Sequence, residues 1–167
     1  MYKERIYRQC AKDDDLISFQ AMVKETDLYV KANQDLSLKT IDYIQEVRKE
    51  IEDYVVIDPE FKTSLKPYIV NGRAPQIAKE MSELSASLGV GPFASIAGAI
   101  AEYVGKKLFN YSDEVIVENG GDVYIKTLKD RIVGIYAGEY SAGNKIGVQI
   151  KAKEIPLILI FFESGSS

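Results

Sequence analysis

The spacing of the apolar residues changes twice along the chain, and this change constrains the fold more than any other feature. Residues 17–24 alternate between apolar and polar side chains, which is the period of a half-buried strand, and residues 28–32 form its expected partner. Residues 36–57 and 75–88 instead carry apolar residues three or four positions apart, which predicts two amphipathic helices with their charges outward. The remainder returns to strands, with candidates at 114–118, 122–127, 131–137 and 145–151.

The stretch GVGPFASIAGAIAEYVGKKL, residues 89–108, predicts a central helix between these two groups of strands. Gly91 and Pro92 form a tight break, and residues 93–108 have the length and apolar density of a core helix. Strands, helices and strands again predict an α+β fold, with helices packed on one face of a largely antiparallel sheet. Because 167 residues can bury one sizeable core, we expect residues 1–167 to form a single domain.

The composition limits which partners and which kinds of chemistry we expect for this chain. The 21 Lys and Arg residues are outnumbered by 25 Asp and Glu, and no basic run is present, so we expect no nucleic-acid partner. No segment has the apolar length of a membrane span or the pattern of a signal peptide, which predicts a cytoplasmic protein without a membrane partner. Histidine is absent, so any chemistry must use carboxylates, lysines, hydroxyls, backbone amides or a hard cation such as Mg²⁺.

The segment VIVENGGDVYIK, residues 115–126, poses the main functional question. Asn119 and Gly120 between two strand-forming runs predict a tight hairpin turn, and that alone would explain them. The turn does not explain Glu118 and Asp122, which would lie close together at its mouth with like charges. Either solvent relieves the two acids, or a lysine or a bound cation does.

Two other turns have both a structural and a functional interpretation. Residues 24–27, Lys-Glu-Thr-Asp, are either a polar link between two strands or part of a site. Gly89-Val90-Gly91-Pro92-Phe93 is either a break before the helix or a cradle for an anion, since the free N–H groups of a helix N-terminus attract phosphate.

Taken together, these stretches resemble uncharacterised protein family 280 (UPF0280-type), found in archaea and bacteria and related to the ApbE-like FAD:protein FMN transferases. The matching segments are VKETDLYV at 23–30, PEFKTSLKPY at 59–68, GVGPFASIAGAIAEYVGKKL at 89–108, EVIVENGGDVYI at 114–125 and IYAG at 135–138. The resemblance implies an ApbE-like, T-fold-related α+β fold. It also implies Mg²⁺ and a flavin nucleotide, FAD or FMN, as cofactors, because ApbE proteins use them to attach FMN to a threonine of a partner protein.

By similarity, Gly120, Gly121 and Asp122 correspond to the glycine-glycine-aspartate turn of ApbE. The central helix of ApbE carries a lysine-glycine step, whereas the comparable stretch ASIAGAIAE has Gly98 and no lysine. The chain departs further at its end: relatives continue past Lys151 into a region where ApbE places metal-binding Asp and Thr residues, but this chain runs IPLILIFFESGSS. The apolar run 155–162 is interpreted either as a buried strand or as part of a truncated or frame-shifted C-terminus.

These observations predict a small anionic ligand of cofactor size, a flavin nucleotide with Mg²⁺, bound between the start of the central helix and the glycine turn. The predicted cofactor-binding residues are Gly89, Val90, Gly91, Pro92, Phe93, Asn119, Gly120 and Gly121, and the predicted metal ligands are Glu118 and Asp122. The alternatives are a non-catalytic, homo-oligomeric binding or scaffold domain and a truncated, inactive copy.

Overall fold

The structure, a computed structural model, describes residues 15–136, 145–152 and 156–159. Two strands, β1 (Ile17–Val23) and β2 (Thr26–Ala32), come first, and the helices follow: α1 (Ser37–Ile57), α2 (Glu60–Thr63), α3 (Gln76–Ser87), the 3-10 helix η2 (Pro92–Ser95) and α4 (Ile96–Leu108). The chain then returns to strands: β3 (Val115–Asn119), β4 (Asp122–Lys126), β5 (Arg131–Tyr136), β6 (Lys145–Ile150) and β7 (Leu157–Leu159).

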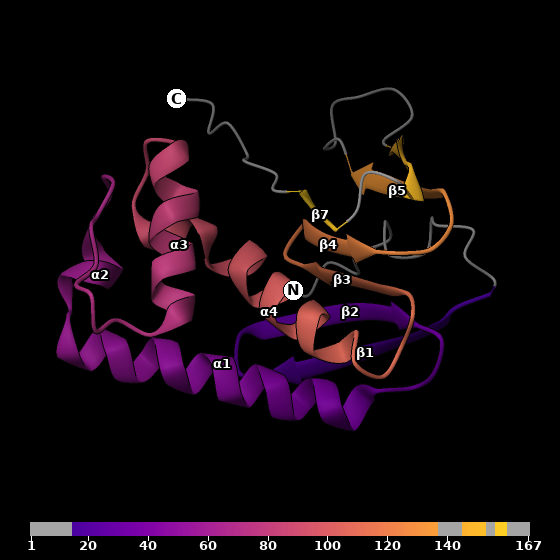
Figure 1. Cartoon of the computed structure of the whole chain (residues 1–167), viewed down its shortest axis with the longest axis horizontal. Coiled ribbons are helices and arrows are strands. Elements are labelled where there is room, and N and C mark those ends of the chain that lie inside the picture. The colour runs from indigo at the N-terminus through magenta and orange to yellow at the C-terminus, as the bar shows by residue number, and fades with distance from the viewer. Residues whose placement is uncertain (1–14, 137–144, 153–155, 160–167) are drawn as a thin grey trace, which may run out of the picture.

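Five of these strands form one antiparallel sheet in the order β1-β2-β3-β4-β7, and β5 pairs with β6 in a separate hairpin (Figure 1). The α+β prediction is therefore confirmed. Of the apolar run 155–162, residues 157–159 form β7, while residues 155 and 160–162, and the prediction of a truncated C-terminus, lie outside the described residues.

The helices cover one face of the sheet, as expected. Val117 and Tyr124 are partners across β3 and β4, and both belong to the main core with side chains from α1, α3 and α4. Their neighbours Ile116 and Ile125 face the other way, into a second apolar cluster with Ile150 at the end of β6. Because side chains alternate along a strand, each face of β3 and β4 builds its own core.

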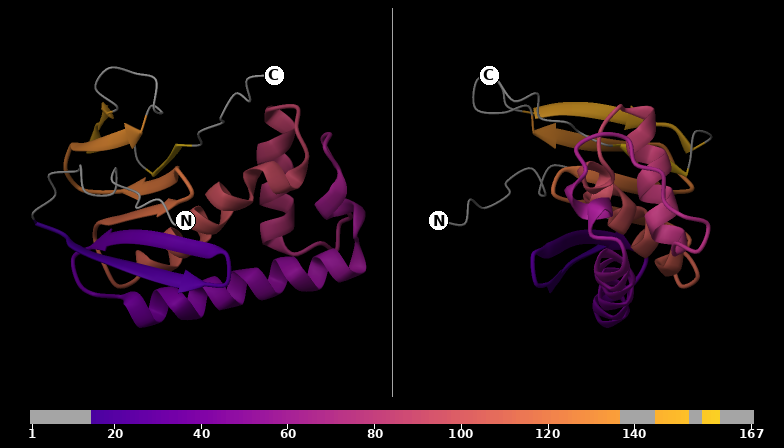
Figure 2. Two further views of the ribbon diagram at one scale, coloured as in Figure 1. Left: turned by 180° about the vertical axis from the view of Figure 1, so that it is seen from behind. Right: turned by 90° about the vertical axis from the view of Figure 1, so that its left-hand side faces the viewer.

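Helix α4 packs unusually close to the sheet at Gly105. A Cβ built there would lie 2.1 Å from the ring of Tyr124, so only glycine allows this approach. Figure 2 shows α1 running the length of the molecule, with α2 and α3 standing beyond the end of the sheet.

The predicted central helix at 93–108 is divided in the structure. Pro92–Ser95 form the 3-10 helix η2, and the α-helix begins only at Ile96. The Ser95 hydroxyl donates to the carbonyls of Pro92 (2.9 Å) and of Met81 in α3 (3.1 Å), which fastens this turn to the preceding helix. The break therefore extends one helical turn further than Gly91 and Pro92 alone indicate.

Within the described residues, no single helix has the length and apolar composition needed to cross a membrane. The stretches Gln76–Ser87 and Pro92–Leu108 reach those values only together, as a pair bent by 98°.

Candidate functional site

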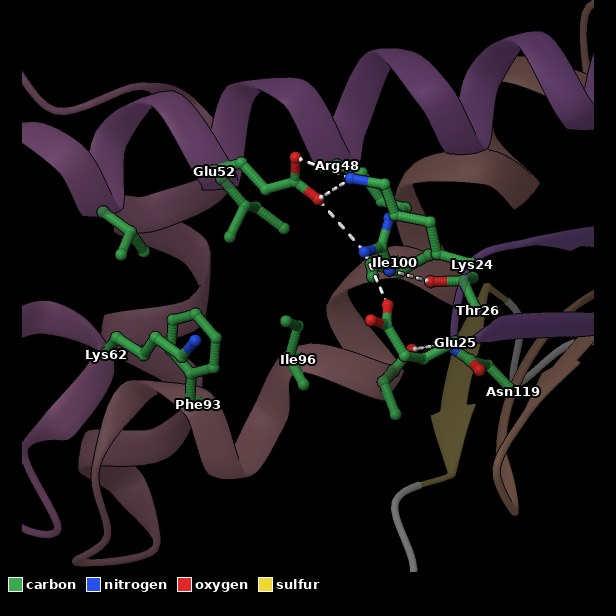
Figure 3. Close-up of a pocket in the computed structure, with 13 residues that line it drawn as sticks. Lys24, Glu25, Thr26, Arg48, Glu52, Lys62, Phe93, Ile96, Ile100 and Asn119 are labelled. Carbon is green, nitrogen blue, oxygen red and sulfur yellow. Dashed lines mark hydrogen bonds and ion pairs between the residues drawn. The ribbon is translucent and has the colours of Figure 1, made fainter.

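A cavity of about 550 Å³ opens where the end of the sheet meets the helices (Figure 3). The turn between β1 and β2 forms one side, α1 forms the roof, and the start of α4 forms the floor, with Lys62 of α2 at the far end. Clefts that bind small molecules usually enclose about 300–1,000 Å³, so this cavity has the volume of a ligand site.

The inner surface of the cavity is apolar. Ile51 and Ile100 are buried where α1 crosses α4, and Phe93 and Ile96 are half-buried below them. The Phe93 ring meets the Phe61 ring edge to face, with centroids 5.6 Å apart, and Phe61 meets Tyr54 of α1 in the same way at 5.1 Å. This chain of rings fixes the position of Phe93, because edge-to-face contacts restrict ring orientation.

Arg48 is the central polar group of the cavity. Its Nη1 donates to the Thr26 hydroxyl at 2.7 Å, and its Nη2 donates to carboxylate oxygens of Glu25 at 2.7 Å and Glu52 at 3.0 Å. The Arg48 side chain is only 16% exposed, and its Nε is buried without a hydrogen-bond partner among the described residues. A cation held this firmly, with one donor unused, is a candidate anion-binding group.

The turn between β1 and β2 consists of Lys24 and Glu25, since Val23 and Thr26 are already paired. Lys24 has a φ of 52°, a left-handed conformation that costs a non-glycine residue about 1–2 kcal/mol. Its ammonium contacts both oxygens of Glu52, at 3.0 and 3.1 Å. Backbone strain of this kind is often retained at binding sites.

The carboxylates of the cavity are ionised at neutral pH. The pKa of Glu25 is lowered by its own backbone N–H and then by Arg48. The pKa of Glu52 is lowered by its hydrogen bond from Lys24, with a further contribution from Arg48. Lys62 has no ion pair within the part of the chain that the structure describes, and Figure 3 shows it beside Phe93. Three cations and two carboxylates leave one excess positive charge around an apolar pocket.

All three turns singled out in the sequence reach this cavity: residues 24–27 through Lys24, Glu25 and Thr26, and the glycine-proline corner at 89–93 and the β3–β4 corner through one residue each. Phe93 comes from the glycine-proline corner and Asn119 from the end of β3, and both line the cavity. The Asn119 amide donates to the Ala97 carbonyl at 3.0 Å, which joins β3 to the first turn of α4. The two corners therefore do lie side by side.

The other residues of the first corner have structural roles. Gly89, with a φ of 73°, ends α3 in the left-handed conformation, and the Val90 N–H donates to Ser85 O at 3.1 Å. A Cβ on Gly91 would lie 1.8 Å from Ser64 O, so glycine is needed there for backbone packing. Pro92 begins η2 and is buried. None of these four lines the cavity, and cofactor binding by them stays a prediction.

Gly120 and Gly121 form the β3–β4 turn at φ values of 64° and 108°, so the tight hairpin is confirmed. The turn also accounts for Glu118: its Oε1 accepts a hydrogen bond from Gly121 N at 2.8 Å. Sequence reasoning treated this acid as unexplained by the turn, whereas its carboxylate closes that turn. Neither glycine lines the cavity, and a cofactor contact by either stays a prediction.

The two predicted metal ligands do not share a face of the sheet. Asp122 is the partner of Asn119, on the face toward α4, whereas Glu118 is the partner of Val123, on the opposite face. Both side chains are buried. Among the described residues, no group of three or more acids or cysteines is arranged to hold a metal ion. Mg²⁺ binding by these two carboxylates stays a prediction.

Sequence reasoning missed the most important residue of the cavity, Arg48. It was assigned to the outward, charged side of the 36–57 helix, but its position four residues after the buried Ile44 places it at the margin of the apolar stripe. This spacing, together with Glu52 one turn later, was the available signal.

Comparison with known proteins finds a family model and several relatives that match most of this chain. The family model described as AbpE bacteria matches residues 8–158. A UPF0280 protein of Methanocaldococcus jannaschii is 36% identical over 135 residues, covering 80% of this chain and 54% of that relative. A UPF0280 protein of Methanococcus aeolicus is 36% identical over 138 residues, covering 81% and 55%, and one of Methanopyrus kandleri is 33% identical over 138 residues, covering 81% and 56%.

The chain thus covers only a little over half the length of each of these relatives. The residues that the family model matches nevertheless include β1 to β4, the four α-helices and every residue that lines the cavity. With a family model that spans most of the chain and relatives above 30% identity, this protein belongs to the UPF0280 family.

Proposed function

We propose that the chain binds a small anionic ligand of cofactor size in the cavity between α1 and α4, with a flavin nucleotide as the first candidate. The observation that carries this proposal is the pairing of an apolar floor with a cationic rim in one cavity of about 550 Å³. A flat ring system would pack against Phe93 and Ile96, and a phosphate would meet Arg48 and Lys24.

The choice of a flavin nucleotide rests on the resemblance to ApbE-like proteins. Small-molecule sites are mostly apolar with a few well-placed polar groups, and this lining has that composition. This chain's residues would orient the bound flavin nucleotide. Arg48 would do so by its fixed guanidinium and Asn119 by its position against α4. No step is assigned to Mg²⁺, since Glu118 and Asp122 lie on opposite faces of the sheet.

Titration of the purified chain with FMN, FAD and riboflavin, followed by flavin fluorescence, tests the proposal. FMN and FAD are expected to bind with saturation, and riboflavin, which lacks phosphate, more weakly. Arg48→Gln is expected to weaken FMN binding about tenfold or more, because charge-assisted hydrogen bonds contribute about 1.5–3 kcal/mol.

Lys49→Gln is the matched control, because it removes the same charge from the neighbouring position of α1, where the side chain is exposed and pairs with Asp53 outside the cavity. Repeating the titration with Mg²⁺ shows whether the ion contributes to binding. The absence of any saturable signal for all three flavins in the wild-type chain would overturn the proposal.

A second candidate function, self-assembly, is favoured by large apolar side chains at the end of the molecule beyond the sheet. Val56 and Ile57 end α1, and Leu65 and Ile69 follow α2; all four are largely exposed. Large exposed apolar side chains, when they adjoin, often mark a contact with another chain. Light scattering should detect an oligomer that Ile69→Glu dissociates and Leu38→Glu, at a largely exposed apolar site near the start of α1, does not. A monomeric wild-type chain would contradict it.

A further inference from the structure

Resting on the proposed function, we infer that Arg48 is the subsite for an oxyanion of the ligand and that the Glu25 carboxylate occupies this subsite when no ligand is bound. Binding of the ligand then displaces Glu25 from Arg48. The chemical class is a terminal phosphate, diphosphate or carboxylate group, whatever the rest of the ligand.

The contacts of Arg48 divide into a fixed set and a removable one. Thr26 belongs to β2 and is buried, and Glu52 lies one helical turn from Arg48 on α1, so both stay in place when the turn moves. These two partners hold the guanidinium against the sheet. Glu25, by contrast, is at the tip of the two-residue turn, and its side chain is 81% exposed.

Glu25 makes only one contact with Arg48, from Oε2 to Nη2 at 2.7 Å. This ion pair is weak on the Glu25 side, because the Glu25 side chain is 81% exposed and water can solvate its carboxylate once it leaves Arg48. The stem of the hairpin does not depend on it, since Val23 and Thr26 are paired directly below the turn. Displacement of this one carboxylate therefore needs little rearrangement.

The unused donor on Arg48 favours a ligand with more than one oxygen. Nε–H lies on the same edge of the guanidinium as Nη2, and it is buried without a hydrogen-bond partner in the described part of the chain. Glu25 accepts from Nη2, which also donates to Glu52, and it does not accept from Nε. A phosphate has oxygens for both donors on that edge, which is the bidentate arrangement that arginine forms with oxyanions.

The balance of charges in the cavity also favours replacement of the Glu25 carboxylate by an anionic ligand. With Glu25 withdrawn, Arg48, Lys24 and Lys62 face the carboxylate of Glu52 alone, and an incoming anion restores the balance. Figure 3 shows the Glu25 carboxylate pointing from the turn toward the guanidinium of Arg48. The carboxylate thus lies where a ligand oxyanion would bind Arg48.

Calorimetric titration with pyrophosphate, FMN and riboflavin tests this inference on four proteins: wild type, Glu25→Gln, Arg48→Gln and Asp53→Asn. Glu25→Gln keeps the size of the side chain and removes the competing charge. Asp53→Asn removes one negative charge from the exposed Lys49–Asp53 pair of α1, outside the cavity, and controls for net charge. Circular dichroism melts establish that each variant folds.

Glu25→Gln is expected to bind pyrophosphate and FMN about two- to fivefold more tightly than wild type, which is the contribution of one exposed ion pair. Asp53→Asn is expected to match wild type, and Arg48→Gln to lose most pyrophosphate binding. Riboflavin should show no gain with Glu25→Gln, because it has no group that competes with the carboxylate.

Equal affinities of Glu25→Gln and Asp53→Asn for pyrophosphate and FMN would overturn the inference while leaving the proposed ligand site intact. An equal gain for riboflavin would also overturn it, since the effect would then not depend on an anionic group. If neither FMN nor pyrophosphate binds any of the four proteins, the proposed function itself fails.

Discussion

Two hairpin turns close strands at the same end of the sheet, and each has a glutamate, but they are built in opposite ways. The β3–β4 turn uses two glycines, at positions where positive φ carries no steric cost, and its Glu118 is buried and bonded to the turn's own backbone. The β1–β2 turn places a lysine at positive φ, and its Glu25 is exposed and extends across the cavity to Arg48.

The two turns therefore differ in role: the glycine turn stabilises the fold, whereas the Lys24–Glu25 turn lines the proposed ligand site. In the glycine turn, each unusual residue is explained by the geometry of the turn itself. In the Lys24–Glu25 turn, both charged side chains instead pair with residues of α1, Lys24 with Glu52 and Glu25 with Arg48. The turn that looks less unusual in the sequence is therefore the better candidate for function.

The largest loss of stability is expected from a substitution in the β3–β4 glycine turn. Gly121→Ala should lower the free energy of unfolding by about 1–3 kcal/mol, because a φ of 108° is strongly unfavourable for a residue with a Cβ. Chemical denaturation measures it. Gly72→Ala is the control, because Gly72 lacks positive φ and a Cβ there would meet no atom within 4 Å. Equal stability of the two variants would show that the turn is not rigid.

Removal of the buried glutamate should have the next largest effect. Glu118→Ala leaves the Gly121 N–H without its acceptor and should destabilise the fold by about 1–3 kcal/mol. FMN affinity should not change, since Glu118 does not line the cavity. A stable variant with lost binding would reverse the roles of the two turns.

Replacement of Lys24 measures the strain in the other turn. Lys24→Gly and Lys24→Ala both remove the ion pair with Glu52, but only glycine relaxes the backbone at a φ of 52°. The glycine variant should therefore be more stable than the alanine variant by about 1–2 kcal/mol in denaturant melts. No difference between them would mean that the turn is unstrained.

The smallest effect is the pH dependence of the Glu25 contact. The pKa of Glu25 is below its ordinary value because of its own backbone N–H and then Arg48, so the contact stabilises the fold at neutral pH. This contribution should disappear as the pH falls through the lowered pKa, below the usual range of a glutamate. Thermal melts of wild type and Glu25→Gln should converge in acid. A constant difference would assign the effect to something other than this carboxylate.

The fold could be predicted because its signals are local. The alternation at 17–24, the helical spacing at 36–57 and the glycine turn at 120–121 each depend on residues close together in the chain, and each is confirmed. The start of α4 was misplaced by one turn because the cause, the Ser95 hydrogen bond to Met81, joins two different helices.

The candidate site was predicted only in part, and for the same reason. Phe93 and Asn119 could be named because each adjoins a recognisable turn. Arg48 could not, since its partner Thr26 lies 22 positions away and the contact exists only once α1 crosses the hairpin. The sequence analysis placed Glu118 and Asp122 together at the mouth of the turn, whereas the strand register puts them on opposite faces of the sheet.

The most direct test of a ligand site at Arg48 compares the FMN dissociation constants of two variants, one from each region. Arg48→Gln changes the cavity beside the Lys24–Glu25 turn, and Glu118→Gln changes the glycine turn while keeping its side-chain volume. With the ligand site at Arg48, Arg48→Gln is expected to weaken binding about tenfold or more, and Glu118→Gln to bind as wild type does. Loss of binding in Glu118→Gln with normal binding in Arg48→Gln would contradict it.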